Sequence, residues 1–186
     1  MIAVIACINK ANSIGRKNDL LYRNKEDMKK FVELTKHYTY LVMGRRTFDS
    51  LYEIPQDDRI LYVLTEDTHG ELEQKIVKEF PNVTFIDEEM LGWLVEQASN
   101  TAIDLAVIGG TSIYNLFLSK LDVVSKIHLT VVHDDLIGDS FFPFIDDKKY
   151  TLVESHDIER SKRRQEANSE LYRTEYRVYQ RKRVEN

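Results

Sequence analysis

The sequence predicts a single-domain α/β protein with a largely parallel sheet covered by helices on both faces. Short, continuously apolar runs alternate with helical patterns up to about residue 121, which is typical of buried parallel strands joined by helices. A strand pattern at 126–132 is followed by no helix, and two long alternating segments, 150–157 and 170–181, come after it. We therefore expect these last strands to be antiparallel, within one domain that spans residues 1–186.

The composition excludes several classes of protein. A net charge of −5 gives no overall attraction for nucleic acid or an anionic membrane. A single cysteine, Cys7, excludes an internal disulfide and fits a reducing compartment. The apolar run 2–8 has no basic stretch before it and polar residues directly after it, which argues against a signal peptide or a membrane span. The histidines lack metal-ligand spacing, so we expect no metal site. The composition as a whole predicts a cytoplasmic protein, and the size of the chain predicts a monomer.

Each expected element follows from its local pattern. Unbroken apolar runs rich in β-branched residues predict strands, and apolar residues spaced three and four apart predict helices. In the helix expected at 88–98, for example, Leu91, Leu94 and Val95 share one face. The expected strands are 2–8, 38–43, 59–65, 83–86 and 105–108, and the expected helices are 24–36, 44–51, 71–79, 88–98 and 110–118.

A long polar loop, 9–23, precedes the first helix, and a loop of this length in a small domain is more often functional than idle. Asn24 is suited to cap the helix that follows. Asp27 borders its apolar stripe; from the residues alone it either completes the helix cap or serves as a functional carboxylate. The residues expected to face the core from this helix are Met28, Phe31, Val32 and Thr35.

Two strand ends carry glycine and lead directly into a helix. Gly109 and Gly110 follow the run 105–108, and Gly44 follows the strand at 38–43 and precedes two arginines and a threonine. Such turns present free backbone N–H groups at the positive end of a helix dipole, where phosphate binds well. A purely steric need for glycine is the alternative explanation, but two such junctions favour one phosphate-bearing ligand between them.

Other charged residues and motifs are less specific. Arg59, at the start of the third strand, is either a solvated charge or a carboxylate clamp. The turn 159–168 contains Arg160, Lys162, Arg163 and Arg164 between two glutamates, and we interpret it as a solvated hairpin tip. The nucleophile-elbow, P-loop and Gly-x-Gly-x-x-Gly motifs are all missing from the sequence.

Taken in order, these blocks resemble the dihydrofolate reductase family over residues 1 to about 181. The blocks are Ile14-Gly15, Asp27-x-x-x-Phe31, Met43-Gly44-Arg45-x-Thr47, Ile108-Gly109-Gly110-x-x-x-Tyr114, Leu129-Thr130, Gly138-Asp139 and Phe142-Pro143. The resemblance implies an eight-stranded, mostly parallel α/β sheet with antiparallel C-terminal strands. It also implies NADPH-dependent reduction of dihydrofolate to tetrahydrofolate, for one-carbon metabolism and thymidylate synthesis, and binding of antifolates.

The resemblance assigns further roles to particular residues. Arg59 would clamp the glutamate carboxylate of the substrate, and Ile5 and Ile108 would offer backbone carbonyls to the pterin. The substrate contacts that it implies are Ile5, Asp27, Met28, Phe31, Leu51, Ile54, Arg59, Ile108, Tyr114 and Thr130. The cofactor contacts that it implies are Cys7, Ile14, Gly15, Gly44, Arg45, Arg46, Thr47, Thr65, Glu66, Gly109, Gly110, Thr111, Ser112, Ile113 and Tyr114.

The implied catalytic residues are Asp27, Thr130 and Tyr22. One carboxylate can accept hydrogen bonds from the pterin amino group and ring nitrogen, and it favours protonation of N5 while hydride goes to C6. Burial beside Phe31 should raise the pKa of Asp27, because desolvation disfavours the charged form. Thr130 would bond to Asp27, and Tyr22 would lie near the water that delivers the proton.

The sequence departs from the family pattern at two places. Leu20-Leu21-Tyr22 stands where the family usually has Leu-Pro-Trp, which frees the backbone and changes how the active-site water is held. Glu66 would repel the cofactor 2′-phosphate if it pointed inward. Two alternatives stay open: another reductase on this fold, of the riboflavin-pathway pyrimidine reductase type, and a non-catalytic nucleotide-binding module. Asp27, Phe31 and Arg59 together argue against the first, and Asp27, Thr130 and Tyr114 against the second.

Overall fold

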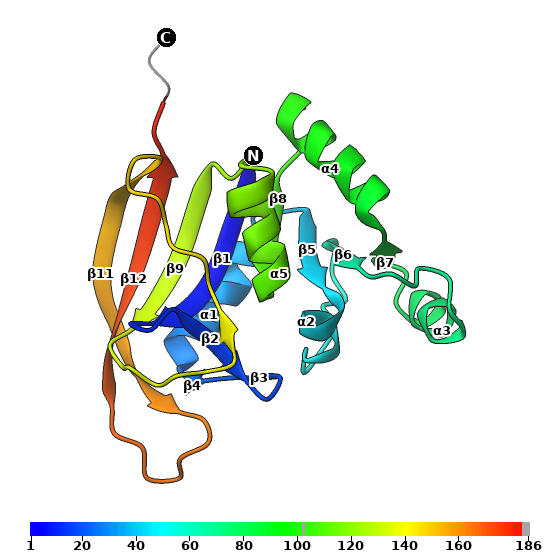
Figure 1. The fold of residues 1–186 in the computed structure, drawn as a ribbon. Helices are drawn as coiled ribbons and strands as arrows, with labels where there is room; N and C mark the ends of the chain where they lie inside the picture. Colours follow the sequence, from blue (N-terminus) through cyan, green and yellow to red (C-terminus); the bar gives the residue numbers. More distant parts are fainter. Residues whose placement is uncertain (102, 184–186) are drawn as a thin grey trace.

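A nine-stranded sheet forms the centre of the protein in the computed structural model, which describes residues 1–101 and 103–183 (Figure 1). β1 (Ile2–Asn9) lies between β8 (Leu105–Gly109) and β9 (Lys126–Val132) and is parallel to both. Beyond β8 the parallel part continues with β5 (Tyr40–Gly44), β6 (Ile60–Leu64) and β7 (Val83–Ile86).

The C-terminal strands complete the other side of the sheet. β12 (Tyr172–Arg181) is antiparallel to β9, and β11 (Tyr150–Arg163) is antiparallel to β12. The expected mostly parallel sheet with antiparallel C-terminal strands is therefore confirmed. The strand beyond the expected eight is β4 (Tyr22–Arg23), which pairs with the end of β11.

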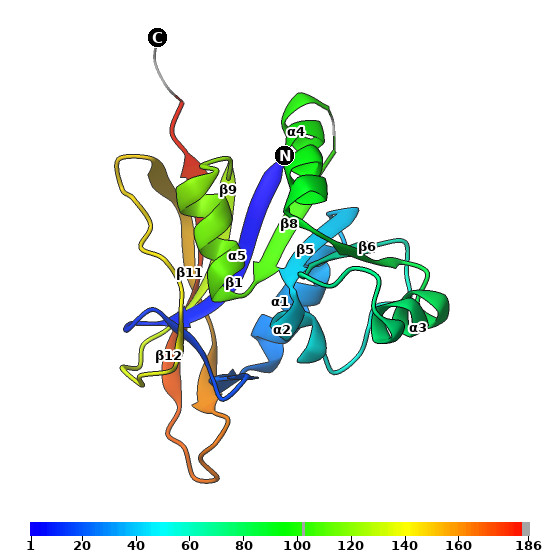
Figure 2. The ribbon, with the colours of Figure 1, turned by 45° about the vertical axis from the view of Figure 1, so that its right-hand side comes forward.

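Helices cover both faces of the sheet (Figure 2). One face carries α4 and α5, and α5 is continued by the π-helical turn η1; the other carries α1, α2 and α3. Among the described residues, no helix is long and apolar enough to cross a membrane. The helices are α1 (Lys25–Thr35), α2 (Arg45–Asp49), α3 (Glu71–Glu79), α4 (Glu88–Asn100), α5 (Thr111–Asn115) and η1 (Leu116–Lys120).

Two hydrophobic clusters explain why β1 is apolar from Ile2 to Ile8. Successive side chains of a strand point to opposite faces, so Val4 and Ile8 pack in the cluster under α4 and α5. Ala3 and Ile5 pack in the cluster under α1 and α2. Burial on both faces is the physical reason that this central parallel strand shows no polar alternation.

The expected core stripe of α1 is partly wrong. Met28 and Val32 are exposed, at 48% and 39% of their surface, whereas Thr35 is fully buried. The helix is rotated because the Asp27 side chain faces β9, where it accepts a hydrogen bond from Thr130. Phe31 therefore packs against the sheet beside Leu34, and Met28 and Val32 lie at the border of the stripe.

The loop 9–23 and the expected turn 159–168 contain more structure than expected. The loop forms β2 (Ser13–Arg16) and β3 (Asp19–Leu20), which join β10 (Ser140–Phe141) in a small separate sheet, and then β4. The turn begins later than expected, because β11 continues to Arg163. Its residues Lys162 and Arg163 pair with β4, a contact across more than 130 positions that no local pattern reveals.

Candidate active site

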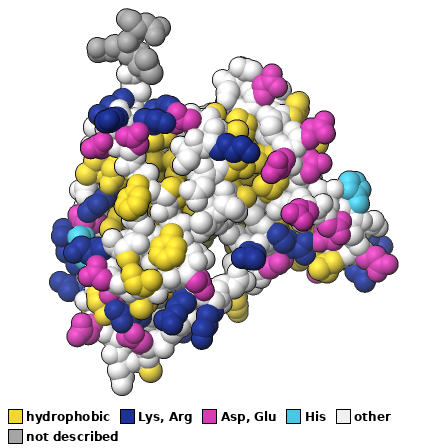
Figure 3. Space-filling view, in the orientation of Figure 1, with side chains coloured by type: hydrophobic (Ala, Val, Ile, Leu, Met, Phe, Trp, Pro, Cys, Tyr) yellow, Lys and Arg dark blue, Asp and Glu magenta, His cyan; other side chains and the backbone are white. Residues whose placement is uncertain are grey.

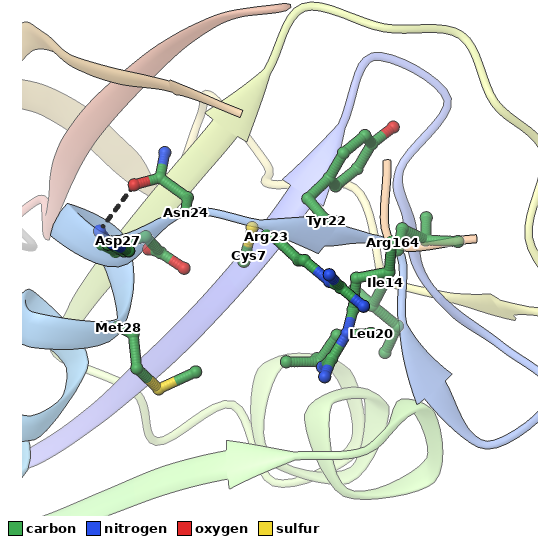
Figure 4. A pocket seen from close by; sticks show the side chains of 11 residues that line it. Cys7, Ile14, Leu20, Tyr22, Arg23, Asn24, Asp27, Met28 and Arg164 are labelled. Carbon is green, nitrogen blue, oxygen red and sulfur yellow. Dashed lines mark hydrogen bonds between the residues drawn. The ribbon is translucent and has the colours of Figure 1, made fainter. Parts of the chain in front are cut away.

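A cavity of about 200 Å³ lies between the loop 9–23 and the first turn of α1 (Figure 4). Five residues with predicted roles line it: Cys7, Ile14, Tyr22, Asp27 and Met28. The remaining lining residues are Leu20, Leu21, Arg23, Asn24, Lys25 and Arg164. The cavity therefore joins a carboxylate to apolar side chains, with basic groups around it.

Asp27 is held in position through both its backbone and its side chain. The Asn24 side chain caps α1 by accepting a hydrogen bond from the Asp27 backbone N–H at 2.9 Å. The Asp27 carboxylate lines the cavity, and its Oδ1 accepts a hydrogen bond from Thr130 Oγ1 at 2.5 Å. The helix-cap and functional-carboxylate explanations are thus compatible, because the cap uses the backbone of Asp27 and leaves its side chain free.

The surroundings of Asp27 decide its proton affinity. Burial raises the pKa of the Asp27 carboxyl, while the hydrogen bonds from Thr130 and Cys7 and the charge of Lys30 act in the opposite direction. Cys7 lies opposite Thr130 in the β1–β9 pairing. Burial, with the nearby Asp27, raises the pKa of the Cys7 thiol well above its ordinary value, so Cys7 is a neutral thiol at physiological pH.

The apolar residues predicted to line the substrate site lie on one face of the sheet. Phe31, Leu51 and Ile54 pack against the cluster that contains Ile5 and Ile108. These residues therefore belong to one apolar cluster, on the face of the sheet that carries α1 and α2.

Arg59 is held close to α1. Its Nε and Nη2 donate to the two carboxylate oxygens of Asp57 at 2.8 and 2.6 Å, and its Nη1 donates to Thr35 Oγ1 at 2.6 Å. The Arg59 side chain is only 11% exposed. A substrate carboxylate would have to share or displace Asp57, so the clamp role of Arg59 stays a prediction.

The two glycine-bearing strand ends meet. A Cβ atom on Gly109 or Gly110 would lie 3.2 Å from Thr47 Oγ1, and one on Gly44 would lie 3.2 Å from Ile113 Cγ1. Gly109 also has a φ of 133°, a conformation that side-chain-bearing residues rarely adopt. Glycine is therefore required at this point both for conformation and for close approach.

Residues around this junction fix its shape. Tyr114 donates from its hydroxyl to the Ile5 carbonyl at 2.9 Å and packs edge-on against Phe142. Thr111 Oγ1 accepts from the Phe141 backbone N–H at 3.1 Å. The junction is thereby tied to both β1 and β10.

Arg45, the first residue of α2, is already paired with two carboxylates. Its Nε donates to Asp49 Oδ1 at 2.9 Å, and its Nη1 donates to Glu73 of α3. Glu73 is buried, whereas Arg46, Glu66 and Ser112 are exposed. Thr65, directly after β6, accepts a hydrogen bond through Oγ1 from the Asp67 N–H at 3.4 Å.

The match to a family model decides the classification. The dihydrofolate reductase model covers residues 1–181. The chain belongs to the dihydrofolate reductase family. A type 6 dihydrofolate reductase from Proteus mirabilis is 30% identical over 144 residues, which are 76% of this chain and 81% of that protein. A dihydrofolate reductase from Heliothis virescens is 30% identical over 184 residues, 94% of this chain and 92% of that protein.

The fold of this dihydrofolate reductase family member is also similar to that of a solved dihydrofolate reductase. The enzyme from Enterococcus faecalis, solved in complex with NADP(H) and RAB-propyl, superposes with a TM-score of 0.73 at 25% identity. The match covers 98% of this chain and 97% of that one. The family resemblance in the sequence is thus confirmed along nearly the whole chain.

Sequence reasoning missed several residues beside this reductase's site. Arg163 was expected in a solvated tip, but it pairs with the buried carboxylate of Asp134 at 2.7 Å, and Arg164 lines the cavity. Asn9, which donates to the Tyr22 hydroxyl, and Glu73, which pairs with Arg45, are also buried. No sequence signal could have found the Arg163–Asp134 and Arg45–Glu73 pairs, because the two residues of each pair are 29 and 28 positions apart. In the part of the chain that the structure describes, no group of three or more His, Cys, Asp or Glu could hold a metal.

Proposed function

We propose that this chain reduces 7,8-dihydrofolate to 5,6,7,8-tetrahydrofolate with NADPH, and that Asp27 is its catalytic carboxylate. The observation that carries this proposal is the Asp27–Thr130 pair, held at 2.5 Å in a cavity beside Cys7. Membership of the dihydrofolate reductase family and the Enterococcus faecalis relative solved with NADP(H) support the reaction and the cofactor.

The residues present fit a dinucleotide at the glycine junction. Side chains at Gly44, Gly109 and Gly110 would fill the space between α2 and α5, so glycine keeps the backbone N–H groups accessible there. NADPH, when bound, supplies the hydride. Its phosphates would be held by the two helix starts together with Arg46, Thr47, Thr111 and Ser112. Its nicotinamide would be bordered by Cys7, Ile14, Gly15 and Tyr114.

Asp27 would orient the substrate and favour protonation of the pterin at N5. Its Oδ1 is occupied by Thr130, so Oδ2 would accept from the pterin. Because burial raises its pKa, the carboxyl binds a proton at a higher pH than an exposed aspartate does. The ring of Tyr22 lines the cavity, but its hydroxyl donates to Asp134. We therefore propose that the Tyr22 ring forms one wall of the cavity and limits the access of water to Asp27.

The remaining predicted contacts extend this proposal. Phe31, Leu51 and Ile54 would enclose the benzoyl group, since they belong to one apolar cluster with Ile5 and Ile108. We also propose that residues 1–186 form one domain and that the protein acts as a cytoplasmic monomer. The riboflavin-pathway type of reductase and the non-catalytic module are not favoured, because the curated relatives bear the name dihydrofolate reductase.

The proposal is tested with Asp27→Asn. Dihydrofolate-dependent loss of NADPH absorbance at 340 nm is expected to fall by about 10²–10⁴-fold at pH 7, because a neutral amide cannot hold the proton. The NADPH dissociation constant should stay within about twofold of wild type. Glu33→Gln on the exposed side of the same helix is the matched control. Near-normal turnover by Asp27→Asn would remove Asp27 from this role.

A further inference from the structure

A buried hydrogen-bonded network lies behind the wall of the cavity. Asn9 Nδ2 donates to the Tyr22 hydroxyl, which donates to Asp134 Oδ2, both at 2.8 Å. Arg163 donates to both carboxylate oxygens of Asp134, through Nε at 2.8 Å and Nη2 at 2.7 Å. Asn9, Tyr22 and Asp134 are 0%, 8% and 6% exposed. The network thus joins β1, β4, β11 and the segment after β9.

The hydrogen-bonding groups of this network are well satisfied. Asn9 Oδ1 accepts from the backbone N–H groups of Ala11 and Ser13 at 3.0 Å, and its Nδ2 also donates to the Leu136 carbonyl at 2.7 Å. Asp134 Oδ1 also accepts from the Asp135 N–H at 2.9 Å. A buried charge is tolerated only with such partners, and a satisfied network is rigid. The loop is therefore fixed from its first residues.

The network meets the cavity at one residue. The ring of Tyr22 lines the cavity, while its hydroxyl points away from Asp27 into the network (Figure 4). β4 is only two residues long, and among the described strands its one partner is β11, with Tyr22 opposite Arg163. The Arg164 N–H adds one hydrogen bond, to the Leu21 carbonyl at 2.8 Å. Leu21 and Tyr22, which form this side of the cavity, thus depend on β11 for their position.

The same strand supports the start of α1. Asn24 Nδ2 donates to the Glu159 carbonyl at 2.6 Å and to Ser161 Oγ at 2.9 Å. Since Asn24 also caps the turn that holds Asp27, β11 sets the relative position of the Tyr22 wall and the Asp27 carboxylate.

We propose that Arg163 and Asp134, with Asn9, are positioning residues for the substrate side of the reaction. They hold the Tyr22 hydroxyl and thereby the wall that faces Asp27, and they lie outside the set of residues that lines the cavity. Among the described residues, the hydrogen bonds of Asn9, Tyr22, Asp134 and Arg163 involve neither Gly44 nor Gly109, so we expect the network to affect substrate binding more than the phosphate junction. The kinetic part of this inference rests on the proposed function.

Two variants separate positioning from general stability. Tyr22→Phe removes one hydroxyl and leaves the ion pair in place. The double variant Asp134→Asn, Arg163→Gln removes both charges together, so that no buried charge is left unpaired. Lys162→Gln is the matched control, because it removes one exposed charge from the neighbouring position of β11.

We expect the KM for dihydrofolate to rise about three- to fivefold in Tyr22→Phe and about tenfold in the double variant. The NADPH dissociation constant should change less than the KM for dihydrofolate in both, because only Ile14 and Gly15 of the loosened segment would border the cofactor. Amide hydrogen exchange in residues 13–23 should become at least tenfold faster, with β1 and β8 unchanged. Lys162→Gln should match wild type in every measurement.

Two results would overturn the inference. One is a KM and a loop exchange rate within twofold of wild type in both variants. The other is a loss of NADPH binding at least as large as the rise in the KM for dihydrofolate, which would indicate a general structural effect. If the wild-type protein does not turn over dihydrofolate, the proposed function fails, whereas hydrogen exchange still decides the role of the network because it requires no turnover.

Discussion

Asp27 illustrates how one residue can favour chemistry at the expense of stability. A carboxyl whose pKa is raised by burial ionises less easily in the folded chain than in the unfolded one. The folded state therefore loses stability as the pH rises through the raised pKa, because the unfolded chain releases its proton first. The ionised Asp27 carboxylate therefore lowers the stability of the folded protein at neutral pH.

We expect Asp27→Asn to be more stable than wild type at pH 7. The two proteins should converge at acidic pH, below the ordinary pKa of aspartate, since the carboxyl is then neutral in both the folded and unfolded states. Urea unfolding at several pH values measures this difference. A variant that is less stable at every pH would show that the hydrogen bond from Thr130 matters more than the burial of the charge.

At the residue scale, the ion pair between Arg45 and Glu73 also bears on the choice of cofactor. A 2′-phosphate near Arg45 would compete with Glu73 and Asp49 for the same guanidinium. We expect Glu73→Gln to tighten NADPH relative to NADH by roughly tenfold, because one negative charge near the phosphate is removed. Calorimetric titration with both cofactors measures the ratio, and the exposed Glu71→Gln, on the same helix, is the control. An unchanged ratio would place the phosphate away from Arg45.

At the scale of elements, the contact of α1 with the sheet contains a buried histidine. His128 of β9 lies between the hydroxyl groups of Tyr38, at 3.4 Å, and Tyr176, at 2.7 Å. Burial, with a smaller effect of the Lys126 charge, lowers the pKa of His128 to about 4. An unfolded histidine binds a proton near pH 6.5. Stability is therefore lost as the pH falls from about 6.5 toward 4.

We expect His128→Gln to remove a large part of this acid sensitivity. A glutamine can still bond to a tyrosine hydroxyl but takes up no proton, so the variant should lose roughly 2–3 kcal/mol less than wild type between pH 7 and 4. Chemical unfolding at both pH values measures it. The exposed His156→Gln is the control; equal losses in wild type and His128→Gln would assign the sensitivity to other groups.

At the scale of the whole molecule, charged groups tie distant segments together at one end of the sheet. Asp122 accepts from Lys149 Nζ at 2.9 Å and from Arg181 Nη1 at 3.0 Å. These two hydrogen bonds, that of Arg181 first, lower the pKa of Asp122 to about 2. Over the rest of the face drawn in Figure 3, acidic and basic side chains are interspersed. The overall charge of −5 thus gives no single-signed surface on this face.

We expect Asp122→Asn to lower stability by about 1 kcal/mol at pH 7 and to have little effect near pH 2. The stabilisation is present above the ordinary pKa of aspartate and is lost as the pH falls toward the lowered value. Asparagine tolerates the φ of 52° at this position, so the backbone is not a confounding factor. Thermal unfolding measures the change, with the exposed Asp147→Asn as control. Equal melting temperatures at pH 7 would contradict it.

The sequence by itself determined the fold class, most of the elements and the family. Parallel strands are read well because burial on both faces makes them continuously apolar, as β1 and β8 show. The glycine junctions and Asp27 were visible because their chemistry depends on short, ordered motifs. The helix α3 and the strand β7 were predicted at their observed bounds, 71–79 and 83–86, because each has a clear local apolar pattern.

Only the tertiary structure decided how distant polar groups are shared. The rotation of α1, the pairing of β4 with β11, and the partners of Arg163 and Arg45 depend on contacts between remote segments. A charged residue has the same local pattern whether it meets water or a buried carboxylate. Its environment is set by packing, which is why Arg163 was expected in solvent and is held instead by Asp134 behind the wall of the site.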